Sequence, residues 1–231
     1  MESRQLVLAQ TLKMVQAGLK SPTSLVAVSK TYPSADILAF YGLGVRDFGE
    51  NQVQELEQKS QDLALLCPNI QWHMIGNLQT NKIRKLYSIK NLKAIHSVDR
   101  LSLVEALIKD EHLLLHDVSI FLQVKTSDEV EKSGFESNEE LVQAISLLQT
   151  SSKLKIHGLM TMGKIRTEDQ LGDAKICFQK LIEVRNELQK AFLGLSLKLS
   201  MGMSGDYTLA SLMGSDYVRV GSLLFGPRHH T

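Results

Sequence analysis

Short runs of apolar and β-branched residues alternate along the chain with longer segments whose apolar residues recur at helical spacing. The short runs predict eight strands, at 25–28, 45–48, 71–75, 94–98, 118–124, 155–160, 197–200 and 217–220. Helical periodicity is clearest at 51–66, 100–109, 138–148 and 168–192, and a further helix is predicted at about 5–19. The prolines at positions 22, 33, 68 and 227 all fall in predicted loops or at element ends, which supports this division.

Two of the predicted helices carry signals that the structure can test. In the helix at 51–66, the apolar residues lie near one face and Lys59 lies elsewhere. The residues of that apolar face are Val53, Leu56, Leu63 and Leu66. Asp99 immediately precedes the helix at 100–109, and we expect its side chain to cap that helix.

The regular alternation of strands and helices predicts the fold class. Eight strands separated by helical segments, with an extra N-terminal helix, favour an α/β fold, a (β/α)8 TIM barrel in which residues 1–231 form one domain. A doubly wound open sheet is the alternative, but it typically has a glycine-rich loop after the first strand. Here Ser-Lys-Thr-Tyr-Pro follows that strand, and Gly42-Leu43-Gly44 precedes a strand, as at the end of a helix.

Composition and charge exclude several classes of protein. Lysine plus arginine is 26 and aspartate plus glutamate is 25, a net charge of +1, which argues against nucleic-acid binding through a basic surface. Cys67 and Cys177 are too few for a disulfide framework and suit a reducing cytoplasm. We expect no signal peptide in the first residues and no membrane span, because no apolar run approaches about 18 residues.

In a TIM barrel the functional residues follow the strands, at their C-terminal ends. Lys30 follows the first strand; partial burial lowers the pKa of an amine, and a neutral amine can form a Schiff base. The alternative is a solvated loop lysine. Asn51 follows the second strand and either caps the next helix or points into the barrel mouth. His73, in the third strand, is expected to be a buried histidine with hydrogen-bond partners rather than a catalytic base.

The loops after the last two strands are rich in glycine and serine, and they indicate a phosphate site. Ser204 lies in the first loop, and Gly221 and Ser222 lie in the second. Backbone N–H groups at a helix start and serine hydroxyls bind phosphate, glycine lets the phosphate approach, and barrels commonly hold phosphate at this position. Two tight turns that merely suit glycine are the alternative.

Arg219 lies within the last strand, two residues before Gly221, so it is predicted to lie deeper, facing the ring of a phosphate-bearing cofactor. An arginine beside the pyridine nitrogen of pyridoxal phosphate (PLP) cannot accept a proton from it, which leaves the ring a weak electron sink. A surface ion pair is the alternative role of Arg219.

Other motifs carry weaker signals. His112 and His116 are four residues apart, but no further metal ligand is evident, so we predict no metal site. His229 and His230 are expected to belong to a terminal tail. Neither GxSxG nor HExxH occurs, which leaves a hydrolase triad or a zinc protease site unsupported.

Several strings together resemble the pyridoxal phosphate homeostasis proteins, a family similar to the N-terminal domain of alanine racemase. They are LVAVSKTYP (25–33), DFGENQVQE (47–55), QWHMIGNLQTNK (71–82), SVDR (97–100), KSGF (132–135), HGLMTMG (157–163), LSMGMSGDY (199–207) and VRVGSLLFGPR (218–228). The resemblance implies a PLP-bearing barrel with an aldimine on Lys30 and with Asn51 near the cofactor. It also implies Ser204, Gly221 and Ser222 around the phosphate and Arg219 at the pyridine nitrogen. The family usually has threonine at Ser222, and the segment 162–165 lacks a proline often found there.

The resemblance further implies a cytoplasmic protein, which we expect to be a monomer, that holds PLP and delivers it to PLP-dependent apo-enzymes without efficient catalysis. The alternatives are a PLP-dependent amino-acid racemase and, more distantly, a Schiff-base aldolase acting on a phosphorylated sugar. In the racemases a tyrosine from a C-terminal domain is the second acid/base group. This sequence ends at Thr231, and no motif gives that role to any of its five tyrosines, at positions 32, 41, 87, 207 and 217, so we expect little racemisation.

Overall fold

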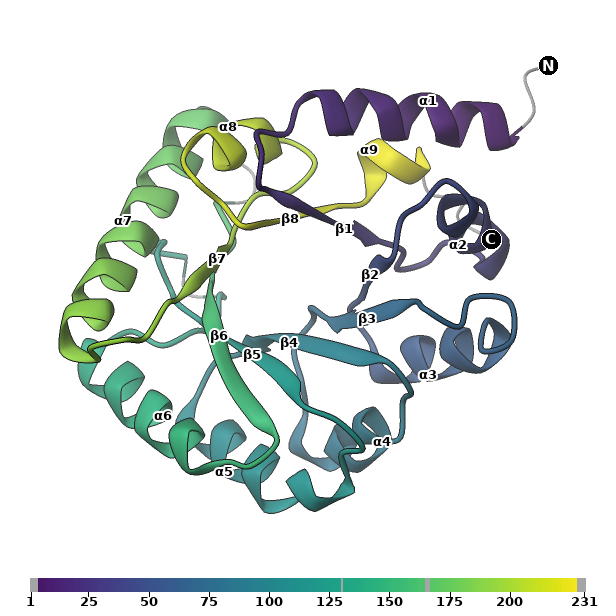
Figure 1. Cartoon of the computed structure of the whole chain (residues 1–231). Coiled ribbons are helices and arrows are strands. Elements are labelled where there is room, and N and C mark those ends of the chain that lie inside the picture. Colours follow the sequence, from purple (N-terminus) through teal and green to yellow (C-terminus); the bar gives the residue numbers. More distant parts are fainter. Residues whose placement is uncertain (1–3, 130, 165–166, 228–231) are drawn as a thin grey trace.

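Eight parallel strands form a closed barrel in which each strand pairs with its neighbours in sequence and β8 returns to β1 (Figure 1). The computed structural model describes residues 4–129, 131–164 and 167–227. The strands are β1 (Ser24–Val28), β2 (Asp47–Glu50), β3 (Gln71–Met74), β4 (Leu92–Val98), β5 (Val118–Gln123), β6 (Leu154–Met160), β7 (Lys198–Ser200) and β8 (Tyr217–Val220). All eight predicted strands are confirmed, and the closed pairing rules out an open, doubly wound sheet.

Helices surround the barrel as an outer ring (Figure 1). They are α1 (Arg4–Ala17), α2 (Ser34–Gly42), α3 (Val53–Asp62), α4 (Ile83–Tyr87), α5 (Leu101–Lys109), α6 (Asn138–Thr150), α7 (Gln170–Ala191), α8 (Tyr207–Leu212) and α9 (Ser222–Phe225), with 3-10 turns at Thr80–Lys82 and Glu111–Leu113. The TIM barrel fold and the extra N-terminal helix are therefore confirmed. Gly44 has a φ of 95°, which confirms the expected turn after α2.

The main hydrophobic core lies between the strands and the helices, where Phe40, Leu56 and Cys67 are fully buried. A small second cluster of Ala94, Phe121 and Met160 is buried separately from it. Other buried groups on the strands are polar or charged, and they include His73, His96, Ser200 and Arg219. The barrel strands therefore carry a set of buried polar side chains that the site can use.

The N-terminal helix α1 braces the short helix α9, which follows the last strand (Figure 1). The Arg4 guanidinium donates to the Phe225 carbonyl at 2.7 Å, and the Thr11 hydroxyl donates to the Leu224 carbonyl at 2.8 Å. The Tyr32 ring stacks on the Phe225 ring with 4.6 Å between centroids. These contacts hold the C-terminal end of α9, the short helix whose first residue, Ser222, lies at the edge of the site.

Two local predictions were wrong. Helix α3 ends at Asp62, so Leu66 lies beyond it and is 59% exposed, whereas Lys59 is 6% exposed and is buried with the apolar face. Asp99 does not cap α5: the cap position is Arg100, whose guanidinium donates to the Asp99 carboxylate at 2.6 Å.

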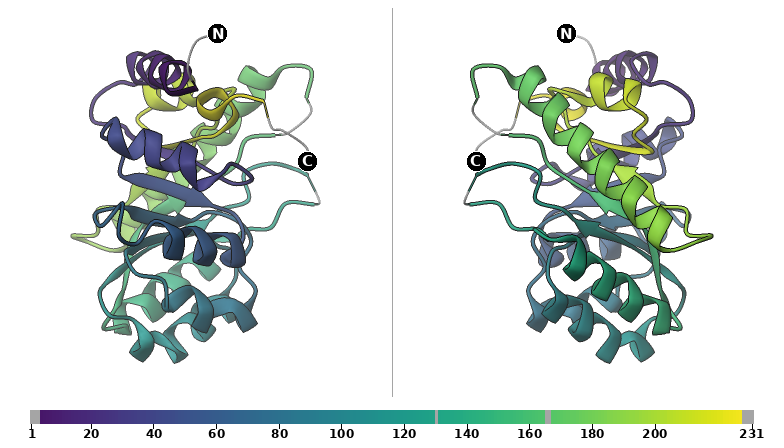
Figure 2. Two further views of the ribbon diagram at one scale, coloured as in Figure 1. Left: turned by 90° about the vertical axis from the view of Figure 1, so that its right-hand side faces the viewer. Right: turned by 90° about the vertical axis from the view of Figure 1, so that its left-hand side faces the viewer.

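The loops after β5 and β6 project from one face of the barrel (Figure 2). In the described part of the chain, no helix has the length and apolar character needed to span a bilayer. His229 and His230 lie outside the described residues, as do Arg228 and Ile165 of the motifs above.

Candidate functional site

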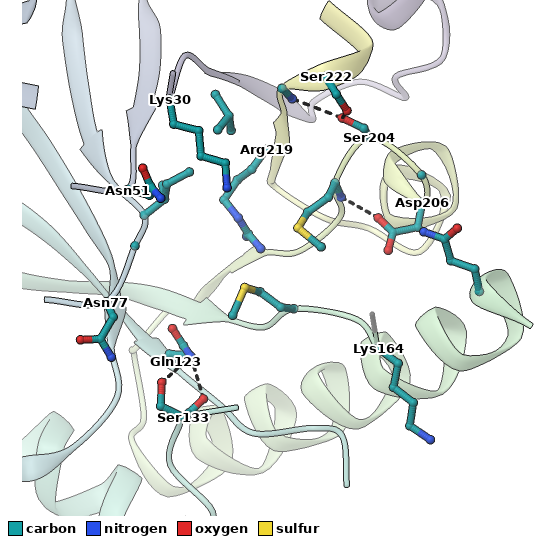
Figure 3. A pocket seen from close by; sticks show the side chains of 18 of the residues that line it. Lys30, Asn51, Asn77, Gln123, Ser133, Lys164, Ser204, Asp206, Arg219 and Ser222 are labelled. Carbon is teal, nitrogen blue, oxygen red and sulfur yellow. Dashed lines mark hydrogen bonds between the residues drawn. The ribbon is translucent and has the colours of Figure 1, made fainter. Parts of the chain in front are cut away.

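A cavity of about 550 Å³ opens at the C-terminal mouth of the barrel, between the loops that follow the strands (Figure 3). It is lined by all of the site residues predicted from the sequence, which are Lys30, Asn51, Ser204, Arg219, Gly221 and Ser222. The fold thus brings residues from four separate strand ends together around one space.

Lys30 lies two residues after the end of β1 and is half-buried. Its side chain extends into the cavity toward Arg219, whereas the side chain of Lys164 points away from both (Figure 3). Thr31 has a φ of 68°, which is rare for a β-branched residue, and its N–H donates to the Glu55 carboxylate at 2.6 Å. The chain therefore turns sharply after Lys30, and Glu55 holds that turn.

A buried ionic cluster lies next to Lys30 and holds the ends of β1 and β2 together. The Lys59 ammonium donates to the Ser29 carbonyl at 2.6 Å, to the Glu50 carboxylate at 2.7 Å and to Glu55 at 2.7 Å. The Ser29 hydroxyl donates to the same Glu50 oxygen at 2.7 Å. Burial raises the pKa of Glu50 to about 7, although Lys59 and Ser29 oppose that shift. Glu50 Oε2 has no hydrogen-bond partner among the described residues.

Arg219 is 4% exposed and is clamped from behind. Its Nη1 donates to the Ser200 carbonyl at 2.8 Å and to the Ser200 hydroxyl at 2.7 Å, and its Nη2 donates to the Thr161 carbonyl at 2.8 Å. Burial lowers the pKa of Arg219 to about 10, against the attraction of Asp206, so the guanidinium is charged at neutral pH. Arg219 is thus a rigid cationic donor at the cavity wall rather than a surface ion pair.

Asp206 is the last residue of the loop after β7 and lines the cavity. Burial raises the pKa of its carboxyl group, while the Met203 N–H and the positive charge of Arg219 lower it. Its Oδ1 accepts the Met203 N–H at 2.6 Å, which fixes the loop that carries Ser204.

Three donors converge on one oxygen, the hydroxyl of Ser204. They are the N–H of Gly221 at 3.3 Å, the hydroxyl of Ser222 at 3.2 Å and the N–H of Leu223 at 3.4 Å, all longer than the usual 2.7–3.0 Å. Helix α9 begins directly after Gly221, at Ser222. It has only four residues, so any anion affinity here comes from these individual donors.

Gly221 has a packing role in addition to the expected one of making room for a phosphate. A Cβ atom built at Gly221 would lie 3.1 Å from the Val28 carbonyl oxygen and 3.3 Å from Val28 Cβ. The absence of a side chain at Gly221 therefore lets β8 approach β1 closely.

Asn51 lines the cavity and does not cap α3, whose cap position is Gln52 without a side-chain hydrogen bond. The loop after β3 packs tightly on Asn51, because a Cβ atom at Gly76 would lie 2.2 Å from the Asn51 carbonyl oxygen. Only glycine permits this approach. The mouth position of Asn51 is thus fixed by backbone packing.

His73 is 1% exposed and hydrogen-bonded through both ring nitrogens, which confirms that it is a buried, partnered histidine. His116 donates from Nε2 to the Leu92 carbonyl at 2.8 Å. The part of the chain that the structure describes holds no group of three or more residues that could bind a metal ion.

The chain is similar to known proteins over most of its length. The family model for the alanine racemase N-terminal domain matches residues 7–229. The chain is 41% identical to the pyridoxal phosphate homeostasis protein of Schizosaccharomyces pombe, over 88% of this chain and 84% of that protein. It is 40% identical to the protein of the same name from Synechocystis, over 92% of this chain and 94% of that protein. The chain belongs to the pyridoxal phosphate homeostasis protein family.

Solved structures agree with this family assignment. PipY of Synechococcus elongatus, determined with PLP bound, is 34% identical and superposes with a TM-score of 0.85, covering 95% of this chain and 100% of that one. The alanine racemase of Corynebacterium glutamicum is 15% identical, with a TM-score of 0.73 over 97% of this chain and 61% of that one, and it shares the fold alone.

Some cavity residues of this family member were not identified from the sequence. Gln123, at the end of β5, lines the cavity and donates to the Ser133 carbonyl at 2.7 Å. Thr161 and Ser200, which hold Arg219, were also missed. Thr161 and Ser200 each lie at a strand end, but nothing in the local sequence shows that their partner is Arg219.

Proposed function

We propose that this chain binds PLP in the cavity at the barrel mouth, as a reversible imine on Lys30, and that it holds and delivers the cofactor. One observation carries the proposal. The cavity brings together an amine (Lys30), a clamped guanidinium (Arg219) and a set of N–H and hydroxyl donors around Ser204. These match the aldehyde, the ring nitrogen and the phosphate of PLP. Family membership and the PLP-bound structure of PipY support the same assignment.

The residues around Ser204 fit a phosphate group. Their donors share one hydroxyl oxygen at distances that are long for hydrogen bonds. A phosphate oxygen carries negative charge and accepts shorter, stronger bonds from such donors. In this role the N–H groups of Gly221 and Leu223 and the hydroxyls of Ser204 and Ser222 would hold the phosphate.

Arg219 fits the ring nitrogen, because a guanidinium can only donate hydrogen bonds and an unprotonated pyridine nitrogen can only accept them. Its attachment to Ser200 and Thr161 leaves it little freedom to turn away. When bound, the cofactor supplies an aldehyde that reacts reversibly with a lysine amine. Lys30 provides the amine, and Asn51 lies beside it at the mouth.

The cavity lining supports holding rather than turnover. Racemisation needs two acid/base groups on opposite faces of the reacting carbon, so Lys30 needs a partner. Among the described residues that line the cavity there is no tyrosine, histidine or cysteine. Lys164 points away (Figure 3), and Asp206 accepts the Met203 N–H. We therefore propose that this chain acts as a cytoplasmic monomer and that PLP-dependent apo-enzymes receive the cofactor from it.

A spectroscopic comparison tests this function. The purified protein is mixed with PLP, dialysed, and examined by absorbance before and after borohydride, beside Lys30→Ala and the matched control Lys164→Ala. We expect a yellow protein whose band is bleached by borohydride in the wild type and in Lys164→Ala, and no reducible band in Lys30→Ala. A colourless protein that instead forms a reducible adduct with a phosphorylated sugar would replace this function with that of an aldolase.

A further inference from the structure

A continuous chain of hydrogen bonds runs from the start of β2 to the wall of the cavity, through side chains of five strands. Asp47 Oδ1 lies 2.9 Å from His73 Nε2, and His73 Nδ1 lies 2.9 Å from His96 Nε2. His96 Nδ1 lies 2.8 Å from the Ser200 hydroxyl, which accepts from Arg219 at 2.7 Å. The chain thus connects a carboxylate at the N-terminal end of the barrel with the cation at its C-terminal mouth.

The two ends of this chain determine the direction of every bond in it. Arg219 can only donate, so the Ser200 oxygen accepts and its own hydrogen points to His96 Nδ1. His96 then donates from Nε2 to His73 Nδ1, and His73 donates from Nε2 to the Asp47 carboxylate. The reverse direction would put an imidazolium at His73 inside the barrel. It would also leave the buried Ser200 hydroxyl without an acceptor among the described contacts.

The middle of the chain is shielded from water. His96 is 0% exposed, and its ring stacks on Phe121 with 4.2 Å between centroids and 13° between planes. Burial, together with His73, Arg219 and His157, lowers the pKa of His96 well below its ordinary value, so His96 is neutral. Hydrogen bonds aligned in one direction in such surroundings polarise one another.

Asp47 is the accessible end of the chain. Its side chain is 35% exposed, and Asp47 does not line the cavity. A carboxylate that accepts from one ring nitrogen of a histidine fixes which nitrogen carries the proton. Asp47 is therefore placed to fix the tautomer of His73 and, through it, that of His96.

We propose that Asp47, His73 and His96 are positioning residues for Arg219. His96 accepts the hydrogen of the Ser200 hydroxyl, so the Ser200 oxygen stays turned towards Arg219 and accepts from it. Ser200 in turn holds the guanidinium at the cavity wall. This inference rests on the proposed function for its effect on PLP, but the direction of the hydrogen bonds from Asp47 to Arg219 can be measured without cofactor. Its consequence is that a residue at the opposite end of the barrel controls how firmly the cofactor ring is held.

The first test uses the cofactor-free protein and ¹⁵N NMR of its histidine and arginine side chains, with signals assigned by loss in His73→Gln and His96→Gln. We expect His96 to be neutral with its proton on Nε2, and His73 to carry a proton on Nε2. In Asp47→Ala we expect His73 to become a mixture of tautomers and the Arg219 guanidinium signal to shift. A proton on Nδ1 of His96, or an Arg219 signal that Asp47→Ala leaves unchanged, would overturn the proposal.

The second test measures PLP release from the loaded protein. The control is Asp117→Ala, since Asp117 is an exposed carboxylate just before β5, as Asp47 is the first residue of β2. We expect release about two- to tenfold faster in Asp47→Ala, the effect of weakening one hydrogen bond, with wild-type rates in Asp117→Ala. Asp47→Asn retains a side-chain oxygen that can accept from His73, so its release rate should lie close to that of the wild type.

The outcomes separate this inference from the proposed function. Equal release rates in the wild type, Asp117→Ala and Asp47→Ala would refute the positioning role while leaving PLP binding intact. Failure of the wild type and of Asp117→Ala to bind PLP would instead refute the proposed function, and the NMR measurements on the cofactor-free protein would still decide whether Asp47 acts on Arg219.

Discussion

Glu50 ends strand β2 one residue before Asn51. Its replacement by glutamine tests whether burial raises the pKa of its carboxyl group and so changes the unfolding free energy with pH. The carboxyl group is 0% exposed and shares one oxygen between Lys59 and Ser29, while its other oxygen has no partner among the described residues. Glu50→Gln keeps the shape of the side chain and removes its titration.

The structure gives the sign and the size of the effect. Burial raises the pKa of Glu50 from its ordinary 4.5 to about 7, so the folded protein binds this proton more tightly than the unfolded chain does. The stabilising contribution is therefore complete below pH 4.5 and is lost as the pH rises to about 7. At about 1.4 kcal/mol per pH unit, this raised pKa corresponds to about 3 kcal/mol of unfolding free energy.

Urea unfolding between pH 4.5 and 8, followed by the fluorescence of the single, buried Trp72, measures this contribution. We expect the unfolding free energy of the wild type to fall by about 3 kcal/mol more than that of Glu50→Gln across this range. The exposed residue Glu105 supplies the matched control, and Glu105→Gln should follow the wild type. Parallel curves for the wild type and Glu50→Gln would refute the assignment of a raised pKa to this carboxyl group.

Three further results are expected. Pyridoxal without its phosphate should bind at least a hundredfold more weakly than PLP, because two or three charge-assisted hydrogen bonds of about 1.5–3 kcal/mol each are lost. Ser204→Ala should lower the affinity for PLP by a smaller factor and leave the affinity for pyridoxal unchanged, and equilibrium titrations measure both. Gly76→Ala should lower the unfolding free energy by about 1–3 kcal/mol, measured by urea unfolding, because its Cβ would lie 2.2 Å from the Asn51 carbonyl oxygen. Exchange of the Cα proton of L-alanine in deuterated water should be at least a hundredfold slower than an ordinary turnover of about 10 s⁻¹, since no tyrosine, histidine or cysteine lines the described part of the cavity as a partner for Lys30.

The barrel could be predicted because its strands are buried on both faces and read as short apolar runs between helices. Strand β2 shows the limit of this approach. It was expected at 45–48 but spans Asp47–Glu50, because the charged Glu50 looks like part of a loop. Its partner Lys59 was assigned to the polar side of α3. Nothing in the sequence around either residue indicates that the two form a buried ion pair.

Part of the site could be predicted from the sequence and part could not. Lys30 and the glycine-serine loops have local signatures, which are a lysine just after an apolar strand and small residues before a short helix. Arg219 lies in β8, and its partners are Ser200 in β7 and Thr161 just after β6. Thr161 is 58 residues from Arg219 in sequence. Such contacts depend on how the barrel closes, and no short pattern in one sequence encodes them.

Peptide mapping of the borohydride-reduced complex tests the central claim most directly. The wild-type protein is loaded with PLP, reduced, digested and analysed by mass spectrometry for the lysine that carries the reduced cofactor. We predict modification of Lys30, which extends into the cavity beside Arg219 (Figure 3). The account is contradicted by a reduced adduct on Lys82 or Lys164 with Lys30 unmodified.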